Sequence, residues 1–493
     1  MHNTFCISYQ ITIKMSKKTC LWSIWDSNNP PKQPIRSLAI NMLWWMDFII
    51  NIVLYPIYFI IGKICQYVIG GELYDLANKG LMRYILDLNI NNPNKKIVYF
   101  RLANLKMGLV KDLYLTKNLC KFGMDKIKRG KVYERLTIFF GNGAFTTYDT
   151  KLWKIHREEF YKMVTSEKLH KYAPIYYYSL ANAIKKEINK SSIVDLYTFL
   201  PHVNLIAFCQ TYFKIDVSPY ADKIILPMNR LLKYINNAMD PVFIRFGTQY
   251  TNFKRDIDTV HKFLENLMHD AIEKNTGDED LLKAFTSGIM TKEQLVQFMI
   301  SIVLGGHEGT SRTIMGIICS MLNNDKIVHK LREELDDYFS VSSLSHNIIK
   351  LPYLQNIVNE GLRLYPPVWI CSREVLEDIT VDDIVIKKNT QLMLSPLLIH
   401  RDPNIWGKDA EEFIPERYET MKKYKNNIFF PFLLGPENCT GEKLAILEIS
   451  LFVVEIFKNY NVKIITNIIN PHSAGTFRIT DSYLVKLEQI EEI

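Results

Sequence analysis

The sequence Phe432-Leu433-Leu434-Gly435-Pro436-Glu437-Asn438-Cys439-Thr440-Gly441 is the most informative stretch of this chain. It places Cys439 between Gly435 and Gly441, with Phe432 upstream and a helix-like sequence directly behind. Glycines let the backbone bend and approach a flat ring, and peptide N–H groups that face a sulfur stabilise its thiolate form. The layout therefore favours a loop that presents a thiolate ligand. The alternative is that Cys439, one of 8 cysteines, is a small buried apolar residue.

The composition is that of a folded protein with a sizeable core, since 48% of the 493 residues are hydrophobic and 23% are charged. The formal charge of +8 comes from scattered lysines and arginines. Nucleic acid is therefore the least expected partner, behind an anionic membrane surface or an acidic protein. The cysteines lie far apart without a Cys-x-x-Cys pair, which argues against a zinc site and a secreted disulfide scaffold. A reducing, cytosol-facing environment fits best.

The most apolar part of the sequence lies near its beginning. The run from Met42 to Gly62 carries only Asp47 as a charge, and a bilayer span takes about 20 mostly apolar residues. We predict a polar N-terminal extension over residues 1–37 and a membrane anchor over residues 38–70. A buried or membrane-surface helix is the alternative, and basic residues on both sides of the run leave its orientation undecided.

The rest of the chain, residues 71–493, is predicted to form one mainly helical domain with small β-sheets. Residues 95–110 alternate like a strand pair, and long helical patterns dominate until about residue 375. Short strand patterns then return over residues 375–394 and 462–488. We find no internal repeat and no clean linker that would divide this part.

A long apolar helix is predicted from Leu295 to about Leu322, opened by a Thr291–Gln294 capping box. Its middle reads Gly305-Gly306-His307-Glu308-Gly309-Thr310-Ser311, and each glycine costs roughly 1 kcal/mol relative to alanine inside a helix. A flat cofactor against the helix, with oxygen or water beside Glu308, would explain the glycines. An ordinary close helix crossing is the alternative. A His-Glu-x-x-His metalloprotease site is excluded because Ser311 occupies the second histidine position.

The loop around Cys439 resembles the Phe-x-x-Gly-x-x-x-Cys-x-Gly signature of the cytochrome P450 family. The resemblance implies the cytochrome P450 fold, mainly α with small β-sheets. It also implies a b-type haem whose iron is bound by the Cys439 thiolate, with Phe432 and Gly435 beside the cofactor. Residues 400–413 are similar to membrane-bound eukaryotic members of the family. The match is clear over residues 295–447 and fainter upstream.

Glu360 and Arg363 lie three residues apart on one face of a short helix that begins at Leu351-Pro352 and must stop before Pro366-Pro367. Together with Arg417 they match the family's Glu-x-x-Arg pair and its distant arginine. The resemblance implies that they hold the region beside the haem pocket. The alternative is a surface ion pair worth a few tenths of a kcal/mol.

Gly305-Gly306 and Glu308 match the family's oxygen-binding motif, in which two small residues precede an acid and then a threonine. The family's threonine falls on Gly309, so its hydroxyl is absent from that position. Thr310 or Ser311 would have to replace it, although each further residue points about 100° further round the helix. We predict Glu308 and Thr310 as the catalytic proton relay.

Haem carries two carboxylates, which need cations nearby when they are buried. Trp153 and Arg157, one helical turn apart, match the family's helix that contacts a haem propionate, and Arg373 matches a second propionate arginine. The family usually has a basic residue two positions before the cysteine, where this chain has Glu437. Its charge would repel a propionate unless the side chain turns away.

The resemblance implies a haem-thiolate monooxygenase, an oxidoreductase that inserts one oxygen atom of O2 into a lipophilic substrate such as a fatty acid or sterol. Electrons would come from a separate NADPH-dependent flavin reductase or another donor, because no phosphate-binding glycine loop is apparent. The protein would be a single-pass membrane protein of the endoplasmic reticulum type, with its catalytic domain facing the cytosol. Gly309 and Glu437 favour an alternative, a non-catalytic haem-thiolate sensor that binds ligands without turnover. A peroxide-rearranging haem enzyme is a further alternative, because family members of that kind do not need the threonine. Residues 189–249 carry no recognisable substrate signal.

Overall fold

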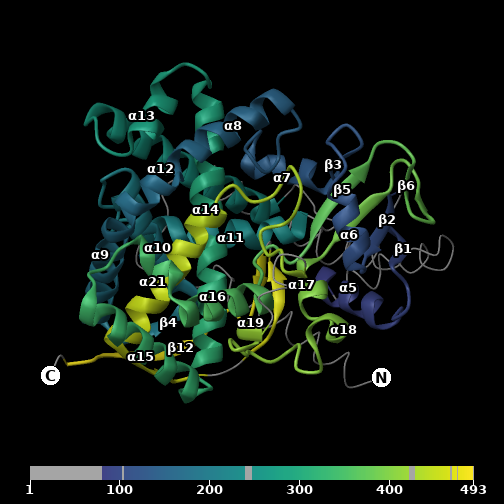
Figure 1. Ribbon diagram of the computed structural model, residues 1–493. Helices are drawn as coiled ribbons and strands as arrows, with labels where there is room; N and C mark the ends of the chain where they lie inside the picture. The colour runs from purple at the N-terminus through teal and green to yellow at the C-terminus, as the bar shows by residue number, and fades with distance from the viewer. Residues whose placement is uncertain are drawn as a thin grey trace, which may run out of the picture. The chain divides into compact units, whose positions relative to one another are not determined.

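A computed structural model describes residues 80–102, 105–238, 247–420, 428–466, 469–474 and 476–491 (Figure 1). Residues 61–245 and 251–493 form one compact unit. All the helices and strands described in this section belong to it, except the first residues of helix α12. The predicted extension and membrane anchor, residues 1–37 and 38–70, lie outside the described residues. Within the described ranges, no helix combines the length and the apolar character that crossing a bilayer requires.

Helices dominate the described part, as the sequence predicts. Their bounds are α5 Leu81–Ile90, α6 Leu113–Leu119, α7 Val132–Phe140, α8 Thr150–Met163, α9 Ser166–Lys190, α10 Leu196–Tyr212, α11 Ala221–Ala238, α12 Gly247–Glu273, α13 Glu279–Thr286, α14 Lys292–Met321, α15 Asp325–Val341, α16 Pro352–Leu364, α17 Pro396–His400, α18 Pro403–Trp406, α19 Arg417–Thr420 and α21 Glu442–Asn459. A short 3-10 helix covers His346–Lys350. The predicted helix between Leu351-Pro352 and Pro366-Pro367 is α16, and its proline at the first turn fits the start of a helix.

The strands form small sheets, also as predicted. They are β1 Ile97–Leu102, β2 Leu105–Val110, β3 Ile127–Arg129, β4 Ile193–Asp195, β5 Cys371–Val375, β6 Ile379–Val381, β7 Ile384–Ile386, β8 Gln391–Leu394, β9 Tyr460–Ile464, β10 His472–Ala474, β11 Thr476–Arg478 and β12 Leu484–Gln489. The largest sheet has the order β1-β2-β8-β5-β3, and β4-β12-β9 form a second one. The antiparallel pairing of β1 with β2 confirms the strand pair predicted over residues 95–110.

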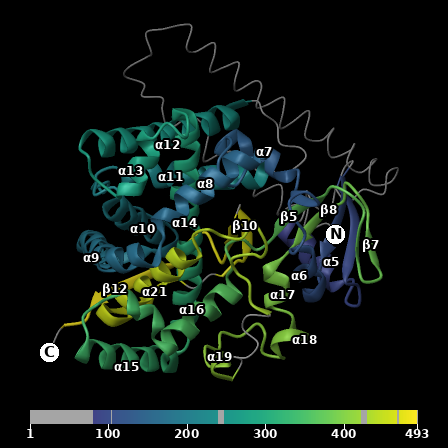
Figure 2. The ribbon, with the colours of Figure 1, turned by 45° about the horizontal axis from the view of Figure 1, so that its top comes forward.

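Four helices, α9, α10, α14 and α21, pack against one another in the helical core. Helix α10 contacts α9 and α14, and α21 contacts α14 and α9. Figures 1 and 2 show α14 running through the middle of this group. The capping box predicted at Thr291 and Gln294 is present with both of its hydrogen bonds, so α14 begins where the sequence indicates. Most of α14 is buried along its 30 residues.

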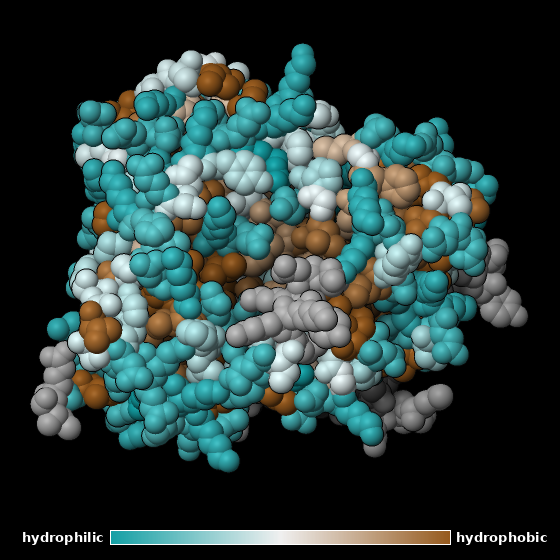
Figure 3. Space-filling model, viewed as in Figure 1, coloured by the Kyte–Doolittle hydropathy of each residue, from teal (hydrophilic) through white to brown (hydrophobic). Residues whose placement is uncertain are grey.

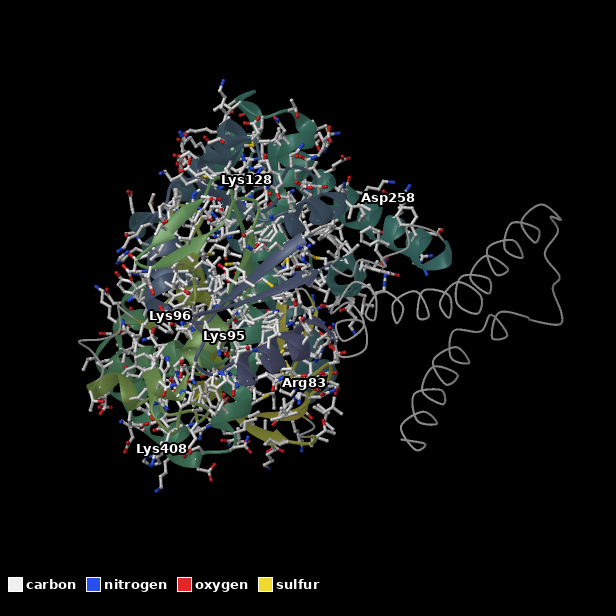
Figure 4. All side chains as sticks on the ribbon, turned by 90° about the vertical axis from the view of Figure 1, so that its right-hand side faces the viewer. Arg83, Lys95, Lys96, Lys128, Asp258 and Lys408 are labelled. Atoms are coloured by element: carbon white, nitrogen blue, oxygen red, sulfur yellow. The ribbon has the colours of Figure 1, made fainter. Side chains whose placement is uncertain are left out.

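Basic side chains are distributed over several elements rather than gathered on one. On the side that carries the largest sheet, Figure 4 labels Arg83 of α5, Lys95 and Lys96 before β1, Lys128 of β3 and Lys408 after α18. The sequence indicates the same scatter. No single helix carries the positive charge.

Candidate functional site

The loop that carries Cys439 is shaped by two backbone features. The Cys439 backbone N–H donates to the Phe432 carbonyl oxygen at 2.8 Å, which closes the loop. Gly435 has a φ of +80°, and a Cβ at this position would collide with the carbonyl oxygen of Cys120. Only glycine satisfies both conditions, because it accepts a positive φ and leaves room for the neighbouring backbone. The conformation thus needs Gly435, in line with the sequence prediction.

The Cys439 side chain is exposed even though protein surrounds it. Burial by that surrounding protein raises the pKa of the thiol to about 11, against a lowering contribution from the Gly441 backbone N–H. This exposure fits a ligand for a metal-bearing group better than a packed core residue. The alternative interpretation, a small buried apolar cysteine, disagrees with this exposure.

The glycines of α14 provide an open surface on a helix that is otherwise largely buried. Gly305 is exposed, and Gly309 is partly exposed one turn further along. A Cβ at Gly305 would lie 2.8 Å from the Phe145 ring, and one at Gly309 would lie 3.6 Å from Pro367. Phe145 and Pro367 both belong to loops, so these two glycines do not serve a close helix crossing. A surface of this kind fits a flat group placed against the helix.

Thr310 and Ser311 do not reach this open surface. The Thr310 hydroxyl donates to the Gly306 carbonyl at 2.6 Å and accepts from Asn204 of α10 at 2.9 Å. The Ser311 hydroxyl donates to the His307 carbonyl at 2.5 Å. Both side chains are buried. Neither hydroxyl therefore replaces the one that Gly309 lacks, which differs from the predicted role of Thr310.

Glu308 is held in a buried ion-pair network. Its carboxylate accepts two hydrogen bonds from Arg312, at 2.8 and 2.9 Å, and lies 3.3 Å from Arg478 of β11. Thr476 also donates to it at 3.1 Å. Burial raises the pKa of Glu308, but the two arginines lower it more and hold it at about 2. A carboxylate that stays ionised and paired in this way is not free to exchange protons at the open surface, in contrast to the proton relay predicted from the sequence.

Glu360, Arg363 and Arg417 form a second buried network. Arg363 donates to both oxygens of Glu360 at 2.8 Å, and Arg417 donates to the same carboxylate at 2.8 Å. The side chains of Glu360 and Arg363 are both 0% exposed. The alternative of a surface ion pair is therefore wrong, and the structural role implied by the resemblance fits the geometry.

This network reaches the Cys439 loop through His400. Arg363 donates to the His400 carbonyl at 2.7 Å, and His400 Nε2 accepts from the Phe430 backbone N–H at 3.1 Å. Burial and the nearby Arg363 lower the pKa of His400 to about 3, so the imidazole is neutral and can accept. Phe430 lies two residues before Phe432, where the loop closes.

Helix α8 binds the other side of the loop. Arg157 donates to the backbone carbonyl and the side-chain oxygen of Asn438, both at 2.8 Å. Its guanidinium lies 5.1 Å from the centre of the Trp153 ring, and Trp153 is buried. The predicted pair thus lies beside the Cys439 loop, and Arg157 also donates to the Tyr161 hydroxyl at 2.6 Å.

Arg373 is also at this edge, together with a residue that the sequence interpretation missed. Arg373 of β5 and Arg129 of β3 lie directly opposite each other in the antiparallel register. Both arginines contact Glu437, at 3.2 and 2.6 Å. Arg129 lies in a three-residue strand without a local sequence motif. Its position beside Arg373 and Glu437 therefore becomes apparent only from the pairing of β3 with β5.

The comparisons with known proteins agree with these features. A family model described as Cytochrome P450 matches residues 87–486. The chain belongs to the cytochrome P450 family. The Cytochrome P450-like protein L532 of Acanthamoeba polyphaga mimivirus is 37% identical over 479 residues, 96% of this chain and 98% of that protein. Cytochrome P450 3A6 of Oryctolagus cuniculus is 27% identical over 385 residues, 69% and 76% of the two chains. Cytokinin hydroxylase of Arabidopsis thaliana is 32% identical over 164 residues, 33% and 32% of the two chains.

Cytochromes P450 bind haem through a cysteine thiolate, and the residues of this P450 fit that cofactor. Cys439 offers the accessible sulfur, and Gly305 and Gly309 expose part of α14 without a side chain, as a flat ring lying against the helix requires. Arg157 and Arg373 would be the cations for the haem carboxylates, as the resemblance implies. Bound haem supplies the oxidation chemistry that makes P450 enzymes monooxygenases in general.

Proposed function

We propose that this P450 is a monooxygenase for a lipophilic small molecule, such as a fatty acid or sterol, and that it takes electrons from a separate flavin reductase. The accessible Cys439 thiol on a P450 loop is the observation that carries this proposal. Apolar surroundings support the substrate class. Phe145 and Val368 are each 42% exposed, and Phe145 lies beside the open glycine surface. Figure 3 also shows exposed apolar residues toward the middle of one face of the molecule.

The protein groups have separable roles in this proposal. Cys439 holds the iron, and Arg157 and Arg373 orient the cofactor through its carboxylates. The ion pair between Glu308 and Arg312 fixes the turn of α14 that carries the open glycines. Because neither Glu308 nor Thr310 faces that surface freely, protons must arrive through water rather than through a side-chain relay.

The second candidate function is a peroxide-rearranging haem enzyme, which needs no O2 activation. It is favoured by the absence of a hydroxyl at Gly309 together with the paired state of Glu308. Both groups that would handle protons for oxygen activation are thus unavailable at the open surface. A non-catalytic haem-thiolate sensor explains the same two observations.

Restoring the missing hydroxyl tests these candidates. The Gly309→Thr variant is expected to raise reductase-coupled product formation by roughly tenfold or more, because a positioned proton-handling group contributes on this scale. The new Cβ would lie 3.6 Å from Pro367, an ordinary contact, so the helix can accept it. Product per NADPH consumed would be measured with a panel of fatty acids and sterols. A hydroperoxide panel without reductase would be measured in parallel.

Gly306→Ser is the matched control, since it adds a hydroxyl to the same turn. Its Cβ would point toward Phe208 of α10, 3.9 Å away, rather than toward the open surface. No gain is expected from it. Conversion of hydroperoxides without reductase, with no reductase-coupled product in either variant, would instead establish the second candidate. Inactivity in both assays despite bound haem would favour the sensor.

We further propose that residues 38–70 anchor the protein in an endoplasmic reticulum-type membrane as a single pass, with the catalytic domain facing the cytosol. The apolar run over residues 42–62 supports this placement. The full-length protein is expected to stay in the membrane pellet after carbonate extraction and to be digested by protease added to sealed microsomes. Release into the supernatant by carbonate, or protection from the protease, would contradict the respective parts of the proposal.

A further inference from the structure

Glu437 occupies the position where the family usually has a basic residue, and its side chain contacts two arginines. Its Oε1 atom lies 2.6 Å from Arg129 Nε, and its Oε2 atom lies 3.2 Å from Arg373 Nε. All three side chains are at most 10% exposed. The three residues come from the Cys439 loop, β3 and β5, which are distant in sequence. One carboxylate therefore joins two arginines that the fold brings together.

The two arginines need such a carboxylate when no other anion is present. Arg129 and Arg373 are direct cross-strand neighbours, and like charges in that relation repel each other. Their other hydrogen bonds go to uncharged carbonyls, from Arg129 to Thr147 at 3.3 Å and from Arg373 to Ser372 at 3.0 Å. Among the described residues, the carboxylate of Glu437 is the one within ion-pair distance of both guanidinium groups.

The contacts with Glu437, Thr147 and Ser372 use the Nε and Nη1 atoms of the two arginines, so their Nη2 atoms remain for a second anion. Oε1 of Glu437 lies at ion-pair distance from Arg129 without accepting a well-directed hydrogen bond. An arginine carries five N–H donors, so each guanidinium can bind Glu437 and another carboxylate together. Arg373 and Glu437 also line a small hollow with Cys120, Leu434 and Pro436.

We propose that Glu437 is an internal counter-ion that holds Arg129 and Arg373 in position before haem binds and then shares them with the haem carboxylates. The three side chains carry a net charge of +1, from two arginines and one glutamate. With Arg157 they offer +2 to the two haem carboxylates, whereas a neutral residue at position 437 would offer +3. Glu437 should therefore stabilise the protein without haem, weaken the retention of haem, and lower its reduction potential, because a nearby negative charge favours the ferric state.

The Glu437→Gln variant tests this inference through two effects of opposite sign. The apoprotein is expected to unfold at lower urea concentration, since two buried arginines lose their counter-ion. Haem transfer to apomyoglobin is expected to slow by roughly tenfold, and the reduction potential is expected to rise. A purely structural role of Glu437 would instead weaken the apoprotein and speed haem loss together, with no rise in potential. None of these measurements requires a substrate or a reductase.

Glu374→Gln is the matched control. Glu374 is a buried carboxylate adjacent to Arg373 on β5, but it pairs with Lys128 and Lys131 at 3.4 Å each. We expect this variant to leave the reduction potential and haem transfer rate unchanged. Glu437→Asp, which keeps the charge, should keep the wild-type potential.

A double variant covers the case in which Glu437→Gln does not fold. Arg129→Gln with Glu437→Gln removes one charge of each sign, so the net charge offered to haem stays at the wild-type value. It is expected to restore folding and to show a potential close to that of the wild type. Faster haem loss in Glu437→Gln, or a potential that does not change, would overturn the inference.

Discussion

Replacing Cys439 with alanine is expected to abolish the strongly red-shifted Soret band of the reduced, carbon monoxide-bound protein. That band requires a thiolate on the iron, and Cys439 is an accessible sulfur on a loop closed by the bond to Phe432. The measurement is an absorption difference spectrum of the full-length protein after dithionite reduction, with and without carbon monoxide. Substrate turnover should be lost in parallel, because the alanine side chain provides no ligand.

Cys120→Ala is the control for general damage to the loop. Cys120 is half-buried, and its carbonyl oxygen lies against Gly435, so the variant changes a thiol next to the loop without removing the predicted ligand. It is expected to keep the red-shifted band. Persistence of the band in Cys439→Ala would show that the ligand has been assigned to the wrong residue. Loss of the band in Cys120→Ala as well would show that damage to the loop, rather than removal of the ligand, abolishes it. A wild-type protein that retains no haem would contradict the cofactor assignment itself.

The elements that local signals define could be predicted from the sequence. The start of α14 follows from Thr291 and Gln294, whose side chains form their capping bonds within one turn. The end of α16 at Leu364 follows from the prolines that come next, since a residue before proline is disfavoured in a helix. The bend of the loop at Gly435 could be predicted for the same reason, because it depends on the backbone conformation of that residue itself.

The charge partners in the site could be predicted only in part. Arg312 lies four residues after Glu308 on the same helix face, so the sequence contained that signal, and the prediction of a proton relay at Glu308 overlooked it. Arg478 is distant in sequence and reaches Glu308 only because β11 packs against α14. Arg129 likewise meets Glu437 only through the pairing of β3 with β5. Spacing along a chain contains no information about such contacts.

The sequence indicated that the Thr310 hydroxyl would point away from the side on which Gly309 lies. It did not indicate which groups that hydroxyl binds instead. Helical geometry places Thr310 about 100° away from Gly309, which argues against a substitution of one hydroxyl for the other. That Thr310 is instead bound by Asn204 depends on α10, where the sequence offered no motif. The structure thus argues against a side-chain proton relay at Glu308, Thr310 and Ser311 alike, since all three side chains are already bound to other groups.

Replacing Arg363 with methionine is expected to lower the free energy of unfolding by about 3–5 kcal/mol, the usual scale for breaking a buried ion pair. Beyond Glu360, Arg363 donates to three backbone carbonyls, those of His400, Ala410 and Glu412, at 2.7, 2.5 and 3.0 Å. Methionine fills a similar volume but leaves these carbonyls unsatisfied, and each such loss costs about 1–3 kcal/mol before relaxation. Urea unfolding of the haem-bound protein would measure the difference.

The control for this prediction is an ion pair with the same spacing on the surface. Lys190 pairs with Glu187 three residues earlier, and its side chain is 59% exposed. Lys190→Met is expected to change stability by less than about 0.5 kcal/mol, because solvent screens an exposed pair. Arg363→Lys keeps the charge and loses the planar fork, so an intermediate effect is expected and a variant remains if Arg363→Met does not fold. Equal effects of Arg363→Met and Lys190→Met would show that burial of the network contributes nothing. In that case His400 and Phe430, and with them the Cys439 loop, would have to be positioned by apolar packing alone.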